Sequence, residues 1–346
     1  MLSLASKQAP KLTAPTEGTL AVLSNLCKAS SDPLRLQVLR VLMKDSFGVS
    51  ELCTIFNIRQ PALSHHLKIL ATAGLVATRR EGNSIYYRRS EMGHDGSLGA
   101  LKGQIFSAVD NIVLPDDTRK QIDSLYRQRE ESSRSFFTQN AHKFQQQQDL
   151  IANYDQYAET VAQLLRDAPL KQHRTALEVG PGDGSFLAEL SPRFERVIAL
   201  DNTAKMLNQA RNRAALDNLH NVEFIHGDTA TPELQDLQAD CIVINMVMHH
   251  TPSPAQIFDD VAKCLAPGGV LLVTDLCSHD QSWAREACGD LWLGFEPGDL
   301  DTWATNAGLQ DIASIYLAQR NGFQVQVRLF GHSQHTKTLS KGNSYE

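Results

Sequence analysis

The run EVGPGDG at residues 178–184 constrains the fold of this chain more than any other segment. It directly follows an apolar run, and glycines at such a place let the backbone turn tightly and approach a ligand without side-chain interference. Beyond it, apolar runs alternate with helical patterns, and strands that alternate with helices form a parallel sheet with crossover helices. We therefore predict an α/β domain whose first five strands cover 175–179, 196–200, 222–226, 240–245 and 269–275.

The last two strands of the sheet should not be parallel to the first five. Two further strand-like runs, 311–317 and 323–330, are joined by only five residues that include Asn321 and Gly322. So short a link cannot make a parallel crossover, so we predict an antiparallel final hairpin.

Composition limits the class of protein. A chain of 346 residues should hold two domains and a connecting helix. Its 42% apolar and 21% charged residues are typical of a globular protein. We find neither the ~20 uninterrupted apolar residues of a membrane span nor the apolar core of an export signal. The six cysteines include no CxxC pair, which indicates reduced thiols and a cytoplasmic protein with no membrane partner.

The first third of the chain has a second pattern. Two helices are expected between Leu20 and Lys44, a short helix over 49–56, and another over 60–73 that Gly74 ends. The runs LVATRR and SIYYRR then flank Glu81-Gly82-Asn83, which is a hairpin signal. Residues 59–89 hold six basic side chains and one acidic one, whereas the whole chain has a net charge of −6. A basic island in an acidic protein is typical of one DNA-binding module.

Within the helix over 60–73, three leucines fall on one side of a helical wheel, and Ser64, His65 and Lys68 fall on the other, with His66 at the boundary. The two histidines could equally be an ordinary solvated face. The preceding helix, the turn and the basic hairpin favour a winged helix-turn-helix instead. The predicted DNA-binding residues are Gln60, Ser64, His65, His66, Lys68, Arg79 and Arg80.

The stretch VSELCTIFNIRQPALSHHLKILATAGLVATRREGNSIYY resembles the ArsR/SmtB winged-helix repressors, over about residues 18–110. The resemblance implies a homodimer built on the flanking helices, reading a double-stranded, pseudo-palindromic operator. Many relatives sense metals through a CxC pair, but here that position reads Cys53-Thr54-Ile55 and offers one thiolate. We therefore expect no metal, and Cys53 as a buried small residue.

Two carboxylates extend the glycine-rich signature. Asp201 ends the second predicted strand of the α/β domain, where it can accept both hydroxyls of a ribose, and Asp228 ends the third, where it suits an exocyclic adenine amine. The alternative of a nicotinamide dinucleotide is disfavoured, since the third glycine follows the second by one residue instead of two.

This set resembles the class I S-adenosylmethionine-dependent methyltransferases, which have a Rossmann-like fold, over about 150–331. The resemblance implies that the glycines approach the methionine portion of the cofactor, that Asp201 binds ribose, and that Asn245 and Met246 face the sulfonium. Met206 and Met246 could equally be plain core. The cofactor-binding residues so implied are Glu178, Gly180, Pro181, Gly182, Gly184, Asp201, Asn202, Met206, Asp228, Thr229, Asn245 and Met246.

The sequence says less about which molecule would accept a methyl group. After the fourth strand the chain reads NMVMHH at 245–250, not the [D/N]PP[Y/F] of amino-directed DNA methyltransferases, and no Pro-Cys pair is present. The pattern is closer to methyltransferases of small molecules, with 278–300 as a lid. Catalytic residues are not identified; the weak candidates are His249, His250, His279 and Glu286.

The whole layout resembles regulators in which an ArsR-type domain is fused to a methyltransferase-like domain, some of which respond to S-adenosylhomocysteine. We expect a winged-helix domain at 18–110, a helical linker and dimerisation region at 111–150, a methyltransferase-like domain at 151–331, and flexible ends at 1–17 and 332–346. The first hypothesis is a transcriptional regulator with S-adenosylmethionine or S-adenosylhomocysteine as effector. The second is an active methyltransferase of a small-molecule acceptor with an autoregulatory DNA-binding domain.

Overall fold

The computed structural model describes residues 17–82, 84–90 and 96–332, which leaves most of the two predicted flexible ends outside the described residues. The chain divides into two units. The first takes in the described residues up to Thr78 and those from Tyr87 to Leu114. The second takes in Arg79–Tyr86 and the residues from Pro115 onward. Within the described ranges, no helix has the length and apolar character needed to cross a membrane.

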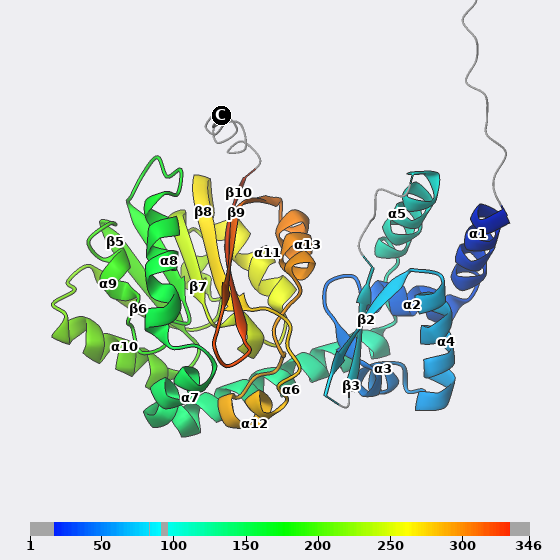
Figure 1. Cartoon of the computed structure of the whole chain (residues 1–346), viewed down its shortest axis with the longest axis horizontal. Coiled ribbons are helices and arrows are strands. Elements are labelled where there is room, and N and C mark those ends of the chain that lie inside the picture. Colours follow the sequence, from blue (N-terminus) through cyan, green and yellow to red (C-terminus); the bar gives the residue numbers. More distant parts are fainter. Residues whose placement is uncertain (1–16, 83, 91–95, 333–346) are drawn as a thin grey trace, which may run out of the picture. The chain divides into compact units, whose positions relative to one another are not determined.

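The first unit is helical with a small sheet (Figure 1). The three strands pair in the order β1-β3-β2. The tips of β2 and β3 are the residues assigned to the second unit. The elements are α1 (Glu17–Ser30), α2 (Pro33–Val41), β1 (Phe47–Gly48), α3 (Val49–Phe56), α4 (Gln60–Thr72), β2 (Val76–Glu81), β3 (Ser84–Arg89) and α5 (Gly96–Asp110).

Local sequence explains where these helices begin and end. Asp32 caps α2 by accepting a hydrogen bond from the Arg35 backbone N–H at 3.0 Å, and Pro33 occupies the first helical position. Asn57 closes α3 in the left-handed conformation, with φ of 51°. The turn between α3 and α4 therefore has the form that the sequence predicts for a helix-turn-helix.

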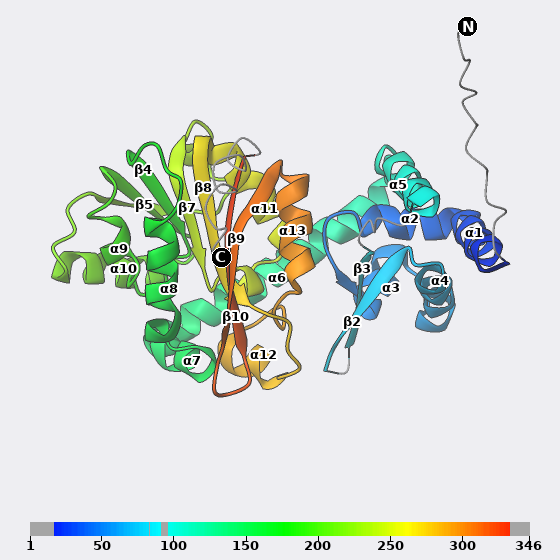
Figure 2. The ribbon, with the colours of Figure 1, turned by 45° about the horizontal axis from the view of Figure 1, so that its top comes forward.

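The second unit is built on a seven-stranded sheet in the order β6-β5-β4-β7-β8-β10-β9 (Figures 1 and 2). Its strands are β4 (Thr175–Val179), β5 (Arg196–Asp201), β6 (Val222–His226), β7 (Ala239–Asn245), β8 (Leu265–Leu276), β9 (Leu309–Ala318) and β10 (Gln324–His332). Its helices are α6 (Asp116–Asn140), η1 (Ala141–Lys143), α7 (Phe144–Ile151), α8 (Tyr154–Arg166), α9 (Leu187–Leu190), α10 (Ala204–Leu216), η2 (Pro232–Leu234), η3 (Met248–His250), α11 (Pro254–Cys264), α12 (Trp283–Cys288) and α13 (Pro297–Asn306).

Alternate residues of each central strand supply the two cores of this sheet. In β4, Ala176 belongs to a core made with α8, α9 and α10, whereas Leu177 belongs to a core made with α11 and α13. A strand that is apolar on both faces needs helices on both sides. The predicted Rossmann-like domain with helix-covered faces is thus confirmed.

The final hairpin is antiparallel as predicted, since β10 pairs antiparallel with both β8 and β9. The helix after the glycine-rich loop is a single turn, Leu187–Leu190, and the helical linker predicted over 111–150 is interrupted at η1. Helix α6, which the sequence assigns to a linker, belongs to the second unit.

Candidate functional site

Most of the residues expected to bind the cofactor lie at one edge of the large sheet. Parallel strands β4, β5, β6 and β7 are consecutive neighbours, so their carboxyl ends meet at the same edge. Glu178, Asp201 and Asn245 stand at or next to three of these ends, and Asp228 follows the fourth. The structure thus brings together residues that are up to 67 positions apart in the sequence.

The glycine-rich loop is held tightly against its neighbours. Gly180 and Gly184 have φ of 67° and 84°, values that side-chain-bearing residues rarely adopt. A Cβ added at Gly180 would lie 2.5 Å from a methyl group of Val247, and one added at Gly184 would lie 2.9 Å from the Cα of Ala210. The packing of the loop between β7 and α10 therefore requires glycine at these positions, in addition to any requirement that a bound ligand imposes.

Met246 is the only non-glycine residue of the site region with a left-handed backbone among those described, with φ of 54°. Its N–H donates to the carbonyl of Thr274 at 2.8 Å, which holds this turn against β8. Strained backbone of this kind persists where surrounding contacts determine it, and it concentrates at functional sites. Met246 is also buried, so the core alternative for its side chain stays open.

Glu178 is a buried acid of the site with a shifted pKa. It is fully enclosed, and burial raises its pKa well above the ordinary value, with the negative charge of Asp183 acting in the same direction and the Asn245 amide opposing. Its Oε2 atom and both polar side-chain atoms of Asn245 form no hydrogen bond with any described residue. The unpartnered carboxyl oxygen of Glu178 and the amide of Asn245 offer one acceptor and a donor–acceptor pair to a bound molecule.

Tyr154 and Tyr157 were not predicted as site residues. Burial raises the pKa of both hydroxyls, and the charge of Glu178 adds to the shift, which places these α8 side chains near the acid. No motif pointed to them, because α8 precedes the glycine-rich loop and its pattern is that of an amphipathic helix.

The ribose end of the predicted site is similarly arranged. Asp201 accepts a hydrogen bond from the Thr203 backbone N–H at 2.7 Å, yet burial raises its pKa to about 6. Asn202 is exposed beside it, and Met206 lies in the core at 3% exposure. The burial of Met206 fits the alternative in which it is plain core, and its contact with a ligand stays a prediction.

Asp228 and Thr229 differ in the exposure of their side chains. Asp228 is exposed and accepts from the Ala230 backbone N–H at 2.9 Å, so its position leaves it open to a ligand. The Thr229 hydroxyl donates to Asp260 on α11 at 3.0 Å and is buried. Of this pair, Asp228 has the side chain that is accessible for binding.

The four weak catalytic candidates do not form one group. His249 and His250 lie in η3 and are buried, with Nδ1 of His249 2.7 Å from Asp275. His279 packs edge-on against Phe323, and burial lowers its pKa to about 4, so it is neutral near pH 7. Glu286 is exposed on α12. The two adjacent histidines pack against each other, with ring centroids 4.0 Å apart.

Asp275 and Asp290 are the acids that sequence reasoning missed beside these histidines. Asp275 is the next-to-last residue of β8, and it accepts from the Met248 backbone N–H at 2.9 Å as well as facing His249. Asp290 follows α12 and lies 3.7 Å from Nδ1 of His250. The rule that singled out Asp201, a polar residue at the carboxyl end of a buried strand, would also have found Asp275.

In the first unit the predicted recognition helix is amphipathic as the wheel requires. Leu63, Leu67 and Leu70 are fully buried. On the opposite side, His65 and Lys68 are exposed, as is Gln60, while Ser64 and His66 are partly buried. His66 lies 3.7 Å from Asp32 through Nδ1, which ties it to the N-cap of α2.

The two arginines of the hairpin tip are placed differently. Arg80 is exposed and donates to the carbonyl of Gly82 at 3.1 Å. Arg79 is paired within the second unit, with Glu81 at 2.5 Å and Asp299 at 3.5 Å. Arg80 is thus the more available of the two for a phosphate contact.

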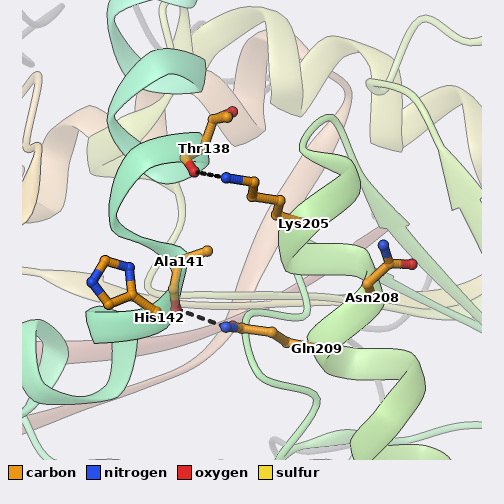
Figure 3. A pocket seen from close by; sticks show the side chains of 6 residues that line it. All are labelled: Thr138, Ala141, His142, Lys205, Asn208 and Gln209. Atoms are coloured by element: carbon orange, nitrogen blue, oxygen red, sulfur yellow. Dashed lines mark hydrogen bonds between the residues drawn. The ribbon is translucent and has the colours of Figure 1, made fainter.

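A cavity of about 260 Å³ lies where α6 ends beside α10 (Figure 3). Two side chains of α10 reach across to carbonyls of the α6 end: Lys205 to Thr138 at 2.9 Å and Gln209 to Ala141 at 2.7 Å (Figure 3). Since α10 begins three residues after Asp201, these bonds join the predicted cofactor edge to α6.

Comparison with known proteins agrees with the two units. A model of the methyltransferase domain matches residues 177–273, and a model of the bacterial regulatory protein arsR family matches residues 32–78. The transcriptional repressor SdpR of Bacillus subtilis (strain 168) is 38% identical over 65 residues, which are 19% of this chain and 72% of the repressor.

Similarity in the second unit is to methyltransferases. The malonyl-(acyl-carrier protein) O-methyltransferase of Marinomonas sp. (strain MWYL1) is 30% identical over 150 residues, which are 42% of this chain and 53% of that protein. The chain thus spans about half the length of this relative. The N-methyltransferase NodS from Bradyrhizobium japonicum WM9, solved in complex with S-adenosyl-L-homocysteine, has a TM-score of 0.43 and 19% identity, covering 55% of this chain and 98% of NodS.

Proposed function

Because the chain belongs to the arsR family of bacterial regulatory proteins and also carries a methyltransferase domain, we propose that it is a DNA-binding transcriptional regulator with a metabolite effector. The effector is S-adenosylmethionine or S-adenosylhomocysteine, bound at the carboxyl edge of the large sheet. DNA is read by α4 and the hairpin. The domain limits proposed for these roles are 18–110, 111–150 and 151–331.

The observation that carries the effector site is the buried pair Glu178 and Asn245. Their unpartnered polar atoms lie inside the second unit, and among the described residues no cation acts on the acid to offset its charge. Both candidate effectors carry an ammonium group, which would supply that charge and donate hydrogen bonds. These residues therefore fit the amino-acid end of such a ligand.

The remaining ligand contacts follow along the same edge. Asp201 would accept from ribose hydroxyls, and the exposed Asp228 would accept from the adenine amine. The glycine-rich loop would bring backbone N–H groups close to the ligand, since its glycines exclude side chains there. S-adenosylmethionine, when bound, supplies an activated methyl group, and this chain's residues only orient it.

The arrangement around the two histidines favours a sensor over an enzyme. His249 and His250 are 0% and 6% exposed, and Nδ1 of His249 is engaged by Asp275. A general base must come within hydrogen-bond reach of the proton that it removes, and enclosed side chains have no such access in this conformation. The alternative, an active methyltransferase of a small molecule, requires η3 or the 278–300 segment to open.

Coupling between effector and DNA has a physical route within the second unit. Asp201 lies three residues before the start of α10, so a ligand that binds Asp201 can shift this end of the helix. Helix α10 in turn holds the end of α6 through hydrogen bonds from Lys205 and Gln209. Helix α6 in turn leads along the chain toward the winged-helix domain. A ligand that favours one position of α10 can thereby favour one arrangement of α6.

We further propose a homodimer that reads two half-sites. Apolar side chains on the two helices that flank the winged-helix core are open to solvent, with Leu20 and Val22 of α1 at 54% and 50% exposure and Leu101 of α5 at 36%. Exposed apolar side chains on two neighbouring helices suit an interface with a second copy. The operator would then be a pseudo-palindrome.

Operator affinity measured with and without ligand tests the function. DNA selected by the protein from a random pool is labelled, and its binding is followed by fluorescence anisotropy with S-adenosylmethionine, S-adenosylhomocysteine or neither. We expect one ligand to change the affinity about 100-fold, a coupling of about 2.7 kcal/mol. Asp201→Ala should abolish this response and retain the ligand-free affinity. Unchanged DNA binding together with methyl transfer to an acceptor would favour the enzyme instead.

A further inference from the structure

Two histidines and one aspartate form a buried cluster that the proposed function does not use. One nitrogen each of His249 and His250 and one carboxyl oxygen of Asp290 all lie within 4.8 Å of one another. The three side chains come from η3 and from the residue pair after α12, so the fold brings together positions 40 residues apart. All three are buried, at 6% exposure or less.

Both histidines have one ring nitrogen engaged and the other without a partner. Nδ1 of His249 is 2.7 Å from the Asp275 carboxylate, and Nδ1 of His250 is 3.2 Å from the Gly289 carbonyl. If each Nδ1 carries the proton, each Nε2 presents a lone pair, and neither Nε2 forms a hydrogen bond with any described residue. Histidines that bind metals are held in this way, with the second nitrogen donating to a carboxylate or a backbone carbonyl.

Asp290 is the third unsatisfied group. Neither of its carboxyl oxygens forms a hydrogen bond with a described residue, and Oδ1 lies 3.9 Å from Nε2 of His249. Arg285 is close enough to affect the charge of Asp290, but its guanidinium donates to Glu81 and to the Leu291 carbonyl. A buried carboxylate that lacks both a hydrogen bond and a bound cation is rare in stable proteins.

We propose that His249, His250 and Asp290 bind a divalent first-row transition metal, with Zn²⁺ as the probe. Two imidazoles and one carboxylate are a common donor set for such ions, and three protein ligands leave a position for water. Zinc lies about 2.0–2.2 Å from these donors, so its ligands are about 3–4 Å apart. The present separations therefore require only a modest inward rotation of the three side chains.

The sequence alone led us to expect no metal. That expectation rested on Cys53, which lies in the other unit, whereas His249 and His250 were considered only as weak catalytic candidates. In the structure, Asp275 fixes both the backbone at Met248 and the ring of His249. A metal would therefore stiffen the segment that follows Asn245, independently of any effector or DNA.

Metal content and affinity of the full-length protein test the site directly, without effector or DNA. We expect about one zinc per chain by plasma mass spectrometry after purification in zinc-containing buffer. After chelation, titration against a chromophoric zinc chelator should show one tight site, and Co²⁺ should give the ligand-field absorption of a nitrogen–oxygen site. Asp290→Asn should weaken zinc binding at least 10-fold, and Asp275→Asn should weaken it about 10- to 100-fold by releasing the His249 ring.

Asp290→Asn is also compatible with folding, since it removes a buried charge whose carboxyl oxygens form no hydrogen bond with a described residue. After metal has been removed by chelation, the Asp290→Asn variant should melt at the same temperature as the unaltered protein or at a higher one. Added zinc should raise the melting temperature of the unaltered protein but not that of the variant. His279→Gln, which alters a nearby histidine outside the cluster, is the matched control and should keep the zinc affinity. Absence of a tight site, or equal zinc affinity in Asp290→Asn, would overturn the proposal and identify the cluster as a proton-sharing network.

Discussion

Replacing Gly184 by alanine tests whether the glycine-rich loop is required by packing. Gly184 has φ of 84°, and the added Cβ would lie 2.9 Å from the Cα of Ala210, a backbone atom that cannot rotate away. The left-handed backbone costs a non-glycine residue roughly 1–2 kcal/mol, and forcing an extra carbon into a packed site costs about 1–3 kcal/mol. We therefore expect the methyltransferase domain to lose about 2–5 kcal/mol of unfolding free energy.

Gly308 offers a matched control in the same domain. Its φ is 79°, but a Cβ there would meet nothing within 4 Å, so Gly308→Ala should cost only the backbone part, roughly 1–2 kcal/mol. The three tryptophans, at 283, 292 and 303, all lie in the methyltransferase domain, so urea unfolding followed by tryptophan fluorescence reports on that domain alone. Equal losses in the two variants would refute the claim that the close contact with Ala210 restricts the loop.

Further predictions concern the acid of the ribose end and the DNA surface. The pKa of Asp201 is raised from 3.8 to about 6 in the folded chain, so the stability it confers is present below pH 4 and is lost as pH rises through 6. Melting temperatures of the ligand-free chain should therefore fall over this window by an amount equivalent to at most about 3 kcal/mol, and Asp201→Asn should flatten the profile; an unchanged profile would contradict the assignment. Arg80→Ala should weaken binding to all DNA sequences and reduce the slope of log affinity against log salt by about 1. His65→Ala should instead relax sequence preference, and a uniform loss in a binding-site selection would place His65 on the backbone rather than on a base.

The sequence predicted the architecture well because the relevant signals are local. Strand β4 and the glycine-rich loop are adjacent in the chain, and the five-residue link before Gln324 allows only an antiparallel hairpin. The leucines of α4 follow the helical period, and all three are buried. Such patterns depend on spacing alone and need no knowledge of distant contacts.

Contacts between distant segments escaped prediction. Asp290 lies in a stretch that reads as a lid, and nothing in its neighbours indicates that it meets His249 and His250. Thr229 follows Asp228 in a cofactor-like motif, yet its hydroxyl bonds to Asp260 on α11.

The central claim is that effector and operator bind one chain with a shared coupling energy. The most direct test measures the affinity for S-adenosylhomocysteine and for S-adenosylmethionine by calorimetry, with and without saturating operator DNA. Coupling is reciprocal, so the operator should change the affinity for the effector by the same factor, about 100-fold, by which the effector changes affinity for the operator. Affinities for both ligands that are unaffected by the operator would contradict the account.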